Sequence, residues 1–460
     1  MSDFDLEALV ETFTASRSLT DTYAEVLNNQ AVKYTNALGY EGVEFVDCAP
    51  HHLIARDGTR YLDFIAGFAI HHWGRRHPVI TKALRQAAEA PWPNLLQLGV
   101  PTLSTILAER LTDVAGDGFD RVFFTNCGAE TSDYAIKMAV VATGRKRMLY
   151  LTGDYHGLTL TAISVNGVTK QQKLFHVDGE NLQVPFNDIE TLKRAFAEHG
   201  REIAGLIIEP VQARHGLVAT DAYLTEARAL CEKHGAMLIF DEIKSGFGRT
   251  GRNFFFEWTP VRPDILMLAK GLSAGAVPVG ALLYPERLHR KVFKDVERLA
   301  VFSSTFRENN FSMAAGLAVL HLMEHENPLA NVLAAEARIR DRLDGQMLPS
   351  GEVVEVVGKG LQLSIRVAGR GKSLLRSAID AVEKDLFYTL CCERLMKEHR
   401  IVTMIPNRFG EALAVIPALN IPLALVDAYC DGVLETFTHF SEKSSVAFLG
   451  SVAQSARKLI

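Results

Sequence analysis

The sequence predicts an α/β protein built on a mostly parallel sheet with helices on both faces. Short apolar runs recur through the middle of the chain and alternate with stretches of helical character. Two of these runs end directly on an acid, Glu209 and Asp241, as buried strands do when they reach the edge of a sheet. The expected strands are residues 122–124, 148–151, 206–208, 237–240, 265–268 and 281–284.

The first part of the chain combines amphipathic helices with short strands. Leu6, Leu9, Val10 and Phe13 recur at helical spacing and predict a first helix, and a second is expected around residues 21–33. These elements are expected to form part of a smaller domain. The strands expected next are residues 43–46, 53–55 and 61–64, with Asp57 and Gly58 as a turn.

The C-terminal part mixes strands and helices, which suits a smaller α+β domain. In the middle part of the chain, the apolar residues of 223–234 recur at helical spacing and predict a helix that ends at Gly235, a natural C-cap. Strands are expected at residues 353–357, 361–367 and 412–416, and helices at residues 379–399 and 422–437. The predicted domains are residues 1–75 (N-terminal helices and part of the small domain), 76–340 (large domain) and 341–460 (C-terminal small domain).

The composition is that of an ordinary soluble protein. With 460 residues and 48% hydrophobic content, the chain can bury a large core. A formal net charge of −5 gives no basic surface for nucleic acid, so small-molecule partners are expected. The six cysteines lack paired C-x-x-C spacing, so no metal is expected. Without a signal-peptide pattern or an apolar run of membrane length, we expect a cytoplasmic protein with no membrane contact.

Two charged residues stand at the ends of expected strands. Asp241 follows the run at 237–240, and Lys270 closely follows the run at 265–268. Parallel strands end at one edge of their sheet, where α/β proteins usually bind ligands. An amine in an apolar cleft loses proton affinity and can form a Schiff base with pyridoxal 5'-phosphate (PLP), a cofactor that also needs an acid at its ring nitrogen. A strand-end acid and a solvated lysine without a chemical role would give the same pattern.

The motifs around this pair are specific. Residues 241–251 read DEIKSGFGRTG and residues 263–272 read PDILMLAKGL. With further segments, they resemble the class III aminotransferases of the fold type I PLP enzymes over roughly residues 40–320. The resemblance implies transfer of an amino group between an amine, diamine or ω-amino compound and an aldehyde or keto acceptor, as in ornithine- and putrescine-aminotransferase-like enzymes. The further segments are residues 58–64 (GTRYLDF), 123–130 (FFTNCGAE), 155–157 (YHG), 208–212 (IEPVQ) and 304–306 (STF).

Another stretch predicts an anion site. Cys127, Gly128 and Ala129 end a strand and open a helix, where free backbone N–H groups and the helix dipole favour a phosphate. In the resembled family this turn holds the cofactor phosphate, and family members often have a hydroxyl residue at the position of Cys127 or Ala129, so mainly backbone contacts are expected here. The resemblance implies that Thr305 adds a hydroxyl from the other subunit. It therefore implies a homodimer with its active sites at the subunit interface.

The resemblance also assigns roles to individual residues. Lys270 forms the Schiff base and moves the proton, while Asp241 keeps the ring nitrogen protonated. Tyr155 stacks on the pyridine ring. Glu209 lies beside the active site, although a strand-end acid satisfied by local N–H groups would give the same pattern. The remaining implied cofactor contacts are Ile243 and Lys244, of which Lys244 replaces a glutamine usually near the ring hydroxyl.

The sequence departs from the family where substrates bind. Ala414 or a neighbour stands where many members have an arginine for a substrate carboxylate. Arg214 takes the position of a gating glutamate, and Arg307 that of a glycine. With His71, these two arginines are the candidate substrate residues. Arg214 pairing with a nearby acid and His71 packing on its aromatic neighbours are the competing interpretations.

Ping-pong transamination is the first functional hypothesis. A racemase, aminomutase or decarboxylase on the same scaffold is the alternative, because the outcome depends on which substrate bond is aligned. A non-catalytic relative that only binds the cofactor is a further possibility. A nucleotide-binding module fits poorly, because no G-x-G-x-x-G or G-x-x-x-x-G-K-[ST] opens a helix.

Overall fold

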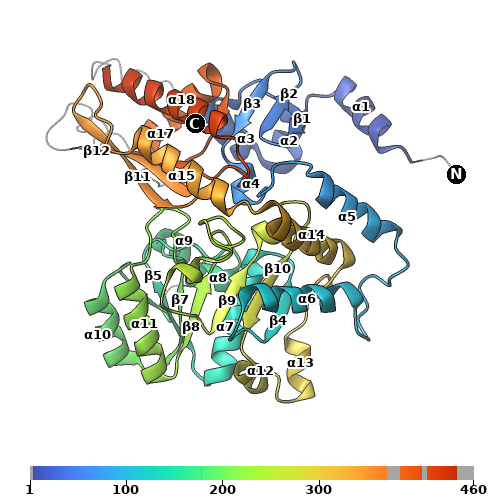
Figure 1. The fold of residues 1–460 in the computed structure, drawn as a ribbon, viewed down its shortest axis with the longest axis vertical. Helices are drawn as coiled ribbons and strands as arrows, with labels where there is room; N and C mark the ends of the chain where they lie inside the picture. The colour runs from blue at the N-terminus through green and yellow to red at the C-terminus, as the bar shows by residue number, and fades with distance from the viewer. Residues whose placement is uncertain (1–3, 178, 370–383, 407–411, 443–460) are drawn as a thin grey trace.

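The computed structural model describes residues 4–177, 179–369, 384–406 and 412–442, and they form two lobes (Figure 1). The lower lobe is built on a seven-stranded sheet with the order β4-β10-β9-β8-β7-β5-β6. All neighbours pair in parallel except β10, which runs antiparallel to both β4 and β9. The strands are β4 (Arg121–Thr125), β5 (Arg147–Leu151), β6 (Leu182–Val184), β7 (Ile203–Ile208), β8 (Met237–Asp241), β9 (Ile265–Leu268) and β10 (Gly280–Tyr284).

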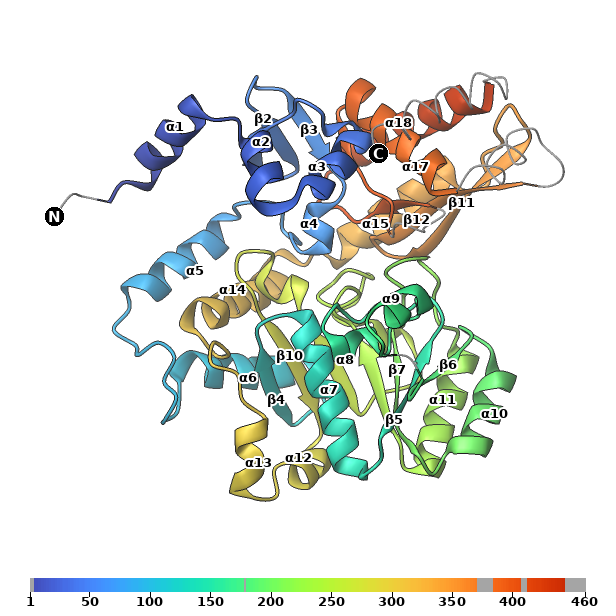
Figure 2. The ribbon, with the colours of Figure 1, turned by 180° about the vertical axis from the view of Figure 1, so that it is seen from behind.

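Helices cover both faces of this sheet because its strands are buried on both sides. In β8, Leu238 and Phe240 pack into one core while Met237 and Ile239 pack into another, as the two-residue period of a strand requires. Helix α7 packs on one face, and α6 and α11 contact the sheet from the other (Figures 1 and 2). The helices of this lobe include α5 (Pro78–Glu89), α6 (Thr102–Ala115), α7 (Gly128–Thr143), α10 (Ile189–His199), α11 (Asp221–His234), α12 (Glu286–Val292), α13 (Val296–Val301) and α14 (Asn310–Glu326).

The upper lobe joins the two ends of the chain. Its four-stranded sheet has the order β1-β2-β3-β13, in which β13 comes from the C-terminal part and pairs in parallel with β3. A three-stranded sheet, β11-β12-β14, and three long helices complete the lobe. The elements are β1 (Phe45–Ala49), β2 (His52–Ala55), β3 (Arg60–Asp63), β11 (Glu352–Lys359), β12 (Gln362–Gly369), β13 (Ile401–Val402), β14 (Leu413–Val415), α15 (Leu329–Leu343), α17 (Lys384–Glu398) and α18 (Leu423–Glu442).

Most of the expected elements are present. The predicted α/β fold with a large, mostly parallel sheet is confirmed, whereas the domain boundaries stay a prediction. The short edge strand β6 was not expected. Of the helix predicted at residues 379–399, residues 379–383 lie outside the described part of the chain. No helix in the described ranges has the length and apolar character needed to cross a membrane.

The helix expected at residues 21–33 is wrong as a single element. It is divided into α2 (Leu19–Tyr23), a π-helical turn and α3 (Asn29–Thr35). Asn28 adopts an extended conformation, and its side chain accepts a hydrogen bond from the backbone N–H of Ala31. An asparagine side chain that caps a new helix in this way ends the previous one. The first helix, α1 (Leu6–Ser16), begins as expected and projects away from the upper lobe (Figure 1).

The packing of the chain ends predicts a stability effect. Tyr429 on α18 stacks on Phe64 at the end of β3, with ring centroids 3.8 Å apart and both side chains fully buried. Tyr429→Ala should lower the free energy of unfolding by about 3 kcal/mol or more, because it leaves a cavity between the two chain ends. Chemical denaturation measures the change. Tyr23→Ala, at a residue that is 45% exposed, should change it by less than about 0.5 kcal/mol, and equal effects would contradict the prediction.

Candidate active site

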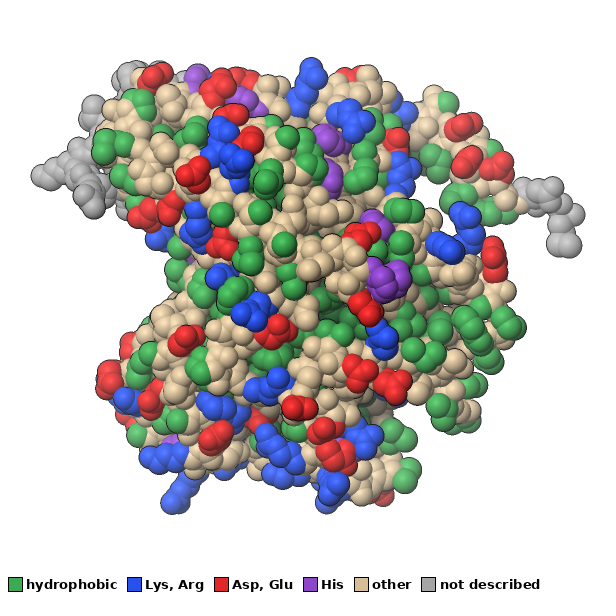
Figure 3. Space-filling model, in the orientation of Figure 1, with side chains coloured by type: hydrophobic (Ala, Val, Ile, Leu, Met, Phe, Trp, Pro, Cys, Tyr) green, Lys and Arg blue, Asp and Glu red, His purple; other side chains and the backbone are tan. Residues whose placement is uncertain are grey.

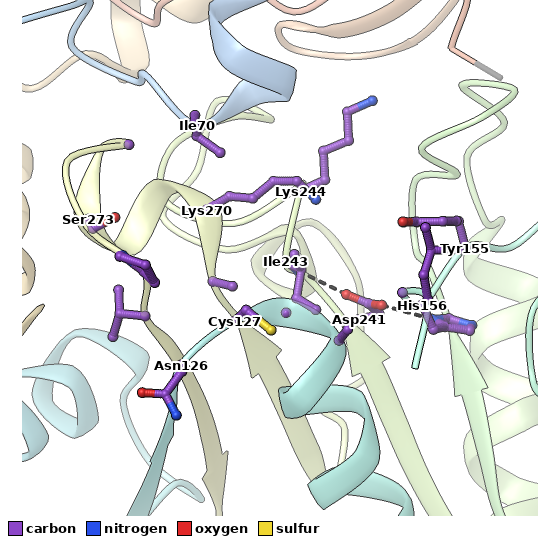
Figure 4. Close-up of a pocket in the computed structure, with 18 of the residues that line it drawn as sticks. Ile70, Asn126, Cys127, Tyr155, His156, Asp241, Ile243, Lys244, Lys270 and Ser273 are labelled. Carbon is purple, nitrogen blue, oxygen red and sulfur yellow. Dashed lines mark hydrogen bonds and ion pairs between the residues drawn. The ribbon is translucent and has the colours of Figure 1, made fainter. Parts of the chain in front are cut away.

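A cavity of about 540 Å³ lies at the edge of the large sheet where the parallel strands end (Figure 4). The fold brings its walls together because β5, β7, β8 and β9 all point toward this edge. Ile70, from the N-terminal segment, lines it as well. The predicted site residues that line the cavity are residues 127–129, Tyr155, Glu209, Asp241, Ile243, Lys244 and Lys270.

Lys270 reaches the cavity from a strained stretch of backbone. It begins a short 3₁₀ turn after β9 with φ of 40°, in the left-handed region that side chains other than glycine rarely adopt. Burial lowers the pKa of the Lys270 amine, while the negative charges of Asp241 and Glu209 act in the opposite direction. The cavity therefore favours an amine that is more readily neutral, and thus more nucleophilic, than a surface lysine.

Asp241 is held as an oriented carboxylate at the end of β8. Its Oδ1 accepts a hydrogen bond of 3.0 Å from the backbone N–H of Ile243. Its Oδ2 pairs with Nδ1 of His156 at 2.8 Å, and Figure 4 shows the carboxylate between these two partners. Because both oxygens are fixed, the carboxylate presents a defined edge to the cavity and can hold a cationic ring nitrogen there.

The start of α7 has the features of an anion-binding turn. Cys127 is the N-cap residue and makes no side-chain cap, so its side chain does not occupy the N–H groups of the first turn. Gly157, with φ of 120°, lies against this turn, and a Cβ there would come within 2.6 Å of Cβ of Ala129. The glycine therefore lets the chain after β5 approach the start of the helix. Backbone N–H groups at this position suit a phosphate.

Glu209 and Tyr155 are joined at the ends of neighbouring strands. The carboxylate of Glu209 accepts hydrogen bonds from the backbone N–H groups of Tyr155, at 2.7 Å, and Ala213, at 3.1 Å. Glu209 lines the cavity and is also satisfied by local N–H groups, so its role in cofactor binding stays a prediction. Burial, followed by the neighbouring carboxylates of Asp154 and Asp241, raises the pKa of Glu209 to about 8.

A second lysine shares the cavity with Lys270. Nζ of Lys244 donates a hydrogen bond of 3.1 Å to the carbonyl of Ala213. Burial, and then the positive charge of Lys270, lowers the pKa of Lys244 to about 7. Two amines in one buried cavity disfavour each other's protonated forms, so the charge on Lys244 is coupled to the state of Lys270.

Four predicted residues do not line this cavity within the single chain. The guanidinium carbon of Arg214 lies 5.0 Å from the centre of the Tyr155 ring. Arg307 pairs with Glu308 at 3.0 Å and lies over Phe123. Nδ1 of His71 contacts the carbonyl of Ala274. The side chain of Thr305 is exposed, and its carbonyl accepts a hydrogen bond from Gln97.

Sequence reasoning missed a buried group behind Asp241. His156 joins Asp241 to Asp154, whose Oδ2 lies 3.7 Å from Nε2 of the ring. All three side chains are at most 5% exposed. A signal was available, because Asp154 and His156 are ionisable residues on either side of Tyr155, shortly after the strand that ends at Leu151.

The residues of this site fit PLP. An amine with lowered pKa, a fixed carboxylate and a helix start with its side-chain cap missing surround one cavity, and the aromatic ring of Tyr155 forms part of its wall. On a seven-stranded, mostly parallel sheet, these features define the fold type I PLP-dependent enzymes.

Comparison with known proteins identifies the family. The sequence profile described as "Aminotransferase class-III" matches residues 49–435. The chain is 34% identical to the acetylornithine aminotransferase of Brucella melitensis, over 71% of this chain and 81% of that one. The chain therefore belongs to the class III aminotransferases, which are PLP-dependent transaminases.

Other relatives extend the likeness. The "Aminotransferase PigE" of a Serratia species is 28% identical over 92% of this chain, which spans only 54% of that protein. An amine transaminase from an uncultivated Pseudomonas species, solved with PLP, has the same fold, with a TM-score of 0.76 and 24% identity over 86% of this chain and 95% of its own. The ornithine aminotransferase of Toxoplasma gondii aligns with a TM-score of 0.74 and 23% identity over 93% of this chain and 100% of its own.

The pair of lysines predicts a pH effect. Lys244→Gln removes a positive charge near Lys270, so the pKa of the Schiff-base nitrogen expected between Lys270 and PLP should rise, by about one unit. Titration of the visible absorption band of the cofactor measures it. Lys146→Gln, which removes an exposed lysine, should leave the midpoint unchanged. An unchanged midpoint in Lys244→Gln would mean that the two amines do not interact.

Proposed function

We propose that the protein transfers an amino group between an amine, diamine or ω-amino compound and an aldehyde or keto acceptor by a ping-pong route. The observation that carries this proposal is the pairing of Lys270 and Asp241 across one buried cavity. When bound, PLP supplies an aldehyde that links covalently to amines and a ring that accepts the electron pair left when a proton departs.

Lys270 is the reactive amine in this proposal. Its lowered pKa favours the neutral form that bonds to an aldehyde carbon. Once an incoming substrate amine takes that place, the free Nζ of Lys270 lies within the same cavity. It can then accept the proton from the substrate carbon as a base and return it to the cofactor carbon as an acid.

The other residues hold the ring in place. Asp241 faces the ring nitrogen and keeps it protonated, while Tyr155 stacks on the ring. The backbone of residues 127–129 binds the phosphate at the start of α7, and Ile243 packs beside the ring. Glu209 lies next to the reacting groups, and Lys244 lies near the ring hydroxyl. Substrate contacts from His71, Arg214 and Arg307 stay predictions.

The wider setting of the enzyme is also proposed. We retain residues 1–75, 76–340 and 341–460 as the N-terminal segment, the large domain and the C-terminal small domain. The pairing of β13 with β3 supports a small domain made from both ends of the chain. The cysteines of the described chain are free, which supports a cytoplasmic location.

Lys270→Ala tests the catalytic assignment. The variant should stay folded and bind PLP but lose turnover by a factor of about 10³ or more, because it lacks both the covalent link and the proton carrier. Borohydride reduction of the wild-type enzyme followed by peptide mapping should attach the cofactor to Lys270. Lys244→Ala supplies the matched control from the same cavity, and a label on Lys244 or any other lysine would refute the assignment.

We further propose a homodimer in which Thr305 reaches the phosphate of the partner's site. Apolar residues are exposed along the chain between α5 and α6, where Leu98 is 95% and Val100 78% exposed. Figure 3 shows hydrophobic side chains gathered over this segment. Gln97, from the same segment, donates to the carbonyl of Thr305. An apolar surface of this kind is typical of a protein–protein interface.

Mixed dimers test this arrangement. Lys270→Ala and Thr305→Val chains are each expected to be weakly active at limiting PLP. When they are unfolded and refolded together, one site of each mixed dimer regains both residues, so about a quarter of the wild-type activity should return. The same mixture of Lys270→Ala with Lys270→Ala/Thr305→Val chains is the control and should not recover. If activity does not return in the test mixture, Thr305 acts in the active site of its own subunit or in neither active site of the dimer.

A further inference from the structure

We propose that Asp154 is a positioning residue that holds His156 as a doubly protonated imidazolium behind Asp241. The inference rests on the proposed function of Asp241 as the partner of the ring nitrogen. His156 and Asp241 both line the cavity, whereas Asp154 does not. The proposal therefore adds to the partners of the ring nitrogen a residue outside the cavity wall. The resulting line of side chains runs from Asp154 through His156 to Asp241.

The geometry orients the imidazole ring at both nitrogens. Nδ1 lies 2.8 Å from Oδ2 of Asp241, which is hydrogen-bond distance. Nε2 is buried without a hydrogen bond among the described residues, and Oδ2 of Asp154 faces it at 3.7 Å. The backbone N–H of His156 donates to the side-chain oxygen of Asn166 at 2.7 Å. The ring therefore has a carboxylate on each side.

Asp154 is held in a form suited to carry negative charge. Its Oδ1 accepts a hydrogen bond of 2.7 Å from the amide of Gln212, and its Oδ2 accepts one of 3.0 Å from the backbone N–H of Glu209. Both partners are donors, so a carboxyl hydrogen on Asp154 could face an acceptor among these contacts only at Nε2 of a neutral His156 ring. Burial raises the pKa of Asp154 to about 7, while these two hydrogen bonds and a positive charge on His156 act in the opposite direction and favour the ionised form.

The charges around His156 favour its protonation. Although burial opposes a charged ring, the hydrogen bond to Asp241 and the charges of Asp241, Asp154 and Glu209 raise the pKa of His156. The same acids act on the neighbouring cations, Asp241 and Glu209 on Lys270, and Glu209 and Asp154 on Arg214. Three acids therefore raise the pKa of the imidazole.

The functional consequence concerns the ring nitrogen of the cofactor. An imidazolium that donates to Asp241 stabilises this carboxylate as an anion, and an anionic Asp241 is what keeps a pyridine nitrogen protonated. If Asp154 loses its charge, the pKa of His156 falls and the ring becomes neutral at lower pH. The environment of Asp241 then changes although no residue of the cavity wall has been altered.

Nuclear magnetic resonance tests the proposal directly. In wild-type enzyme labelled with ¹⁵N-histidine, both ring nitrogens of His156 should be protonated at neutral pH, with a far-downfield proton at Nδ1. His156→Gln identifies these signals by their loss. In Asp154→Asn, the midpoint for loss of the ring proton should move down by about one pH unit or more. The measurements are made on the PLP-loaded enzyme and repeated without cofactor.

Activity measurements add a second readout. The alkaline limb of the kcat profile of Asp154→Asn should shift to lower pH together with the proton signal, because the required imidazolium is lost at lower pH, with little change in KM for the amine. Asp133→Asn is a matched control, because Asp133 is an acid of the same lobe that bonds to Thr159 away from His156. It should alter neither the signals nor the profile.

The outcomes separate this proposal from the proposed function. A neutral His156 in the wild-type enzyme, or an unchanged midpoint in Asp154→Asn, would overturn the role of Asp154 even if transamination is intact. The wild-type measurement decides the matter if Asp154→Asn does not fold. Loss of the cofactor label from Lys270, with the His156 signals as expected, would instead refute the proposed function alone.

Discussion

The structure depends on a constraint at the ends of the parallel strands, where charges are taken out of water. An isolated ionised side chain costs several kcal/mol to bury, so each such group needs a partner of opposite charge or donors that satisfy it. Asp241 has His156 and the N–H of Ile243, and Glu209 has two backbone N–H groups. Lys270 is the exception, since only the charges of the nearby carboxylates Asp241 and Glu209 offset the burial of its amine. An amine left in this state is well suited to bond covalently.

The upper lobe is needed because the strand ends alone would leave these groups open to solvent. Several contacts tie the glycine-rich loop after β8 to the upper lobe and its connections. Arg249, fully buried, donates to the carbonyls of Leu361 and Pro417. Nδ1 of His72 contacts the carbonyl of Phe247 at 3.0 Å, and the backbone of Leu419 donates to the carbonyl of His72. These bonds bring the N-terminal segment that carries Ile70 over the cavity.

The sequence was sufficient to predict those site residues whose position follows from the end of a strand or the start of a helix. Asp241 and Lys270 could be placed together because each follows a strand of one parallel sheet, and Gly128 because it opens a helix. The surroundings of Arg214, Arg307 and His71 depend on side-chain packing between distant segments, which periodicity does not encode. Gln97 and Thr305, for example, meet across more than two hundred positions. The break at Asn28 was hidden because a capping asparagine also fits within a helical pattern.

Arg214, which stands where many family members have a glutamate, shows how neighbouring residues can accommodate a buried positive charge. A guanidinium stays charged when buried, so its position must supply compensation. Here it lies over the Tyr155 ring, and the Glu209 carboxylate acts against the effect of burial on its pKa. Glu209 in turn fixes the backbone of Tyr155. The arginine, the ring and the carboxylate therefore interact as a group, and two of its members, Tyr155 and Glu209, line the cavity. In the described chain Arg214 does not line the cavity itself, so a change at Arg214 would alter the cavity through the orientation of Tyr155.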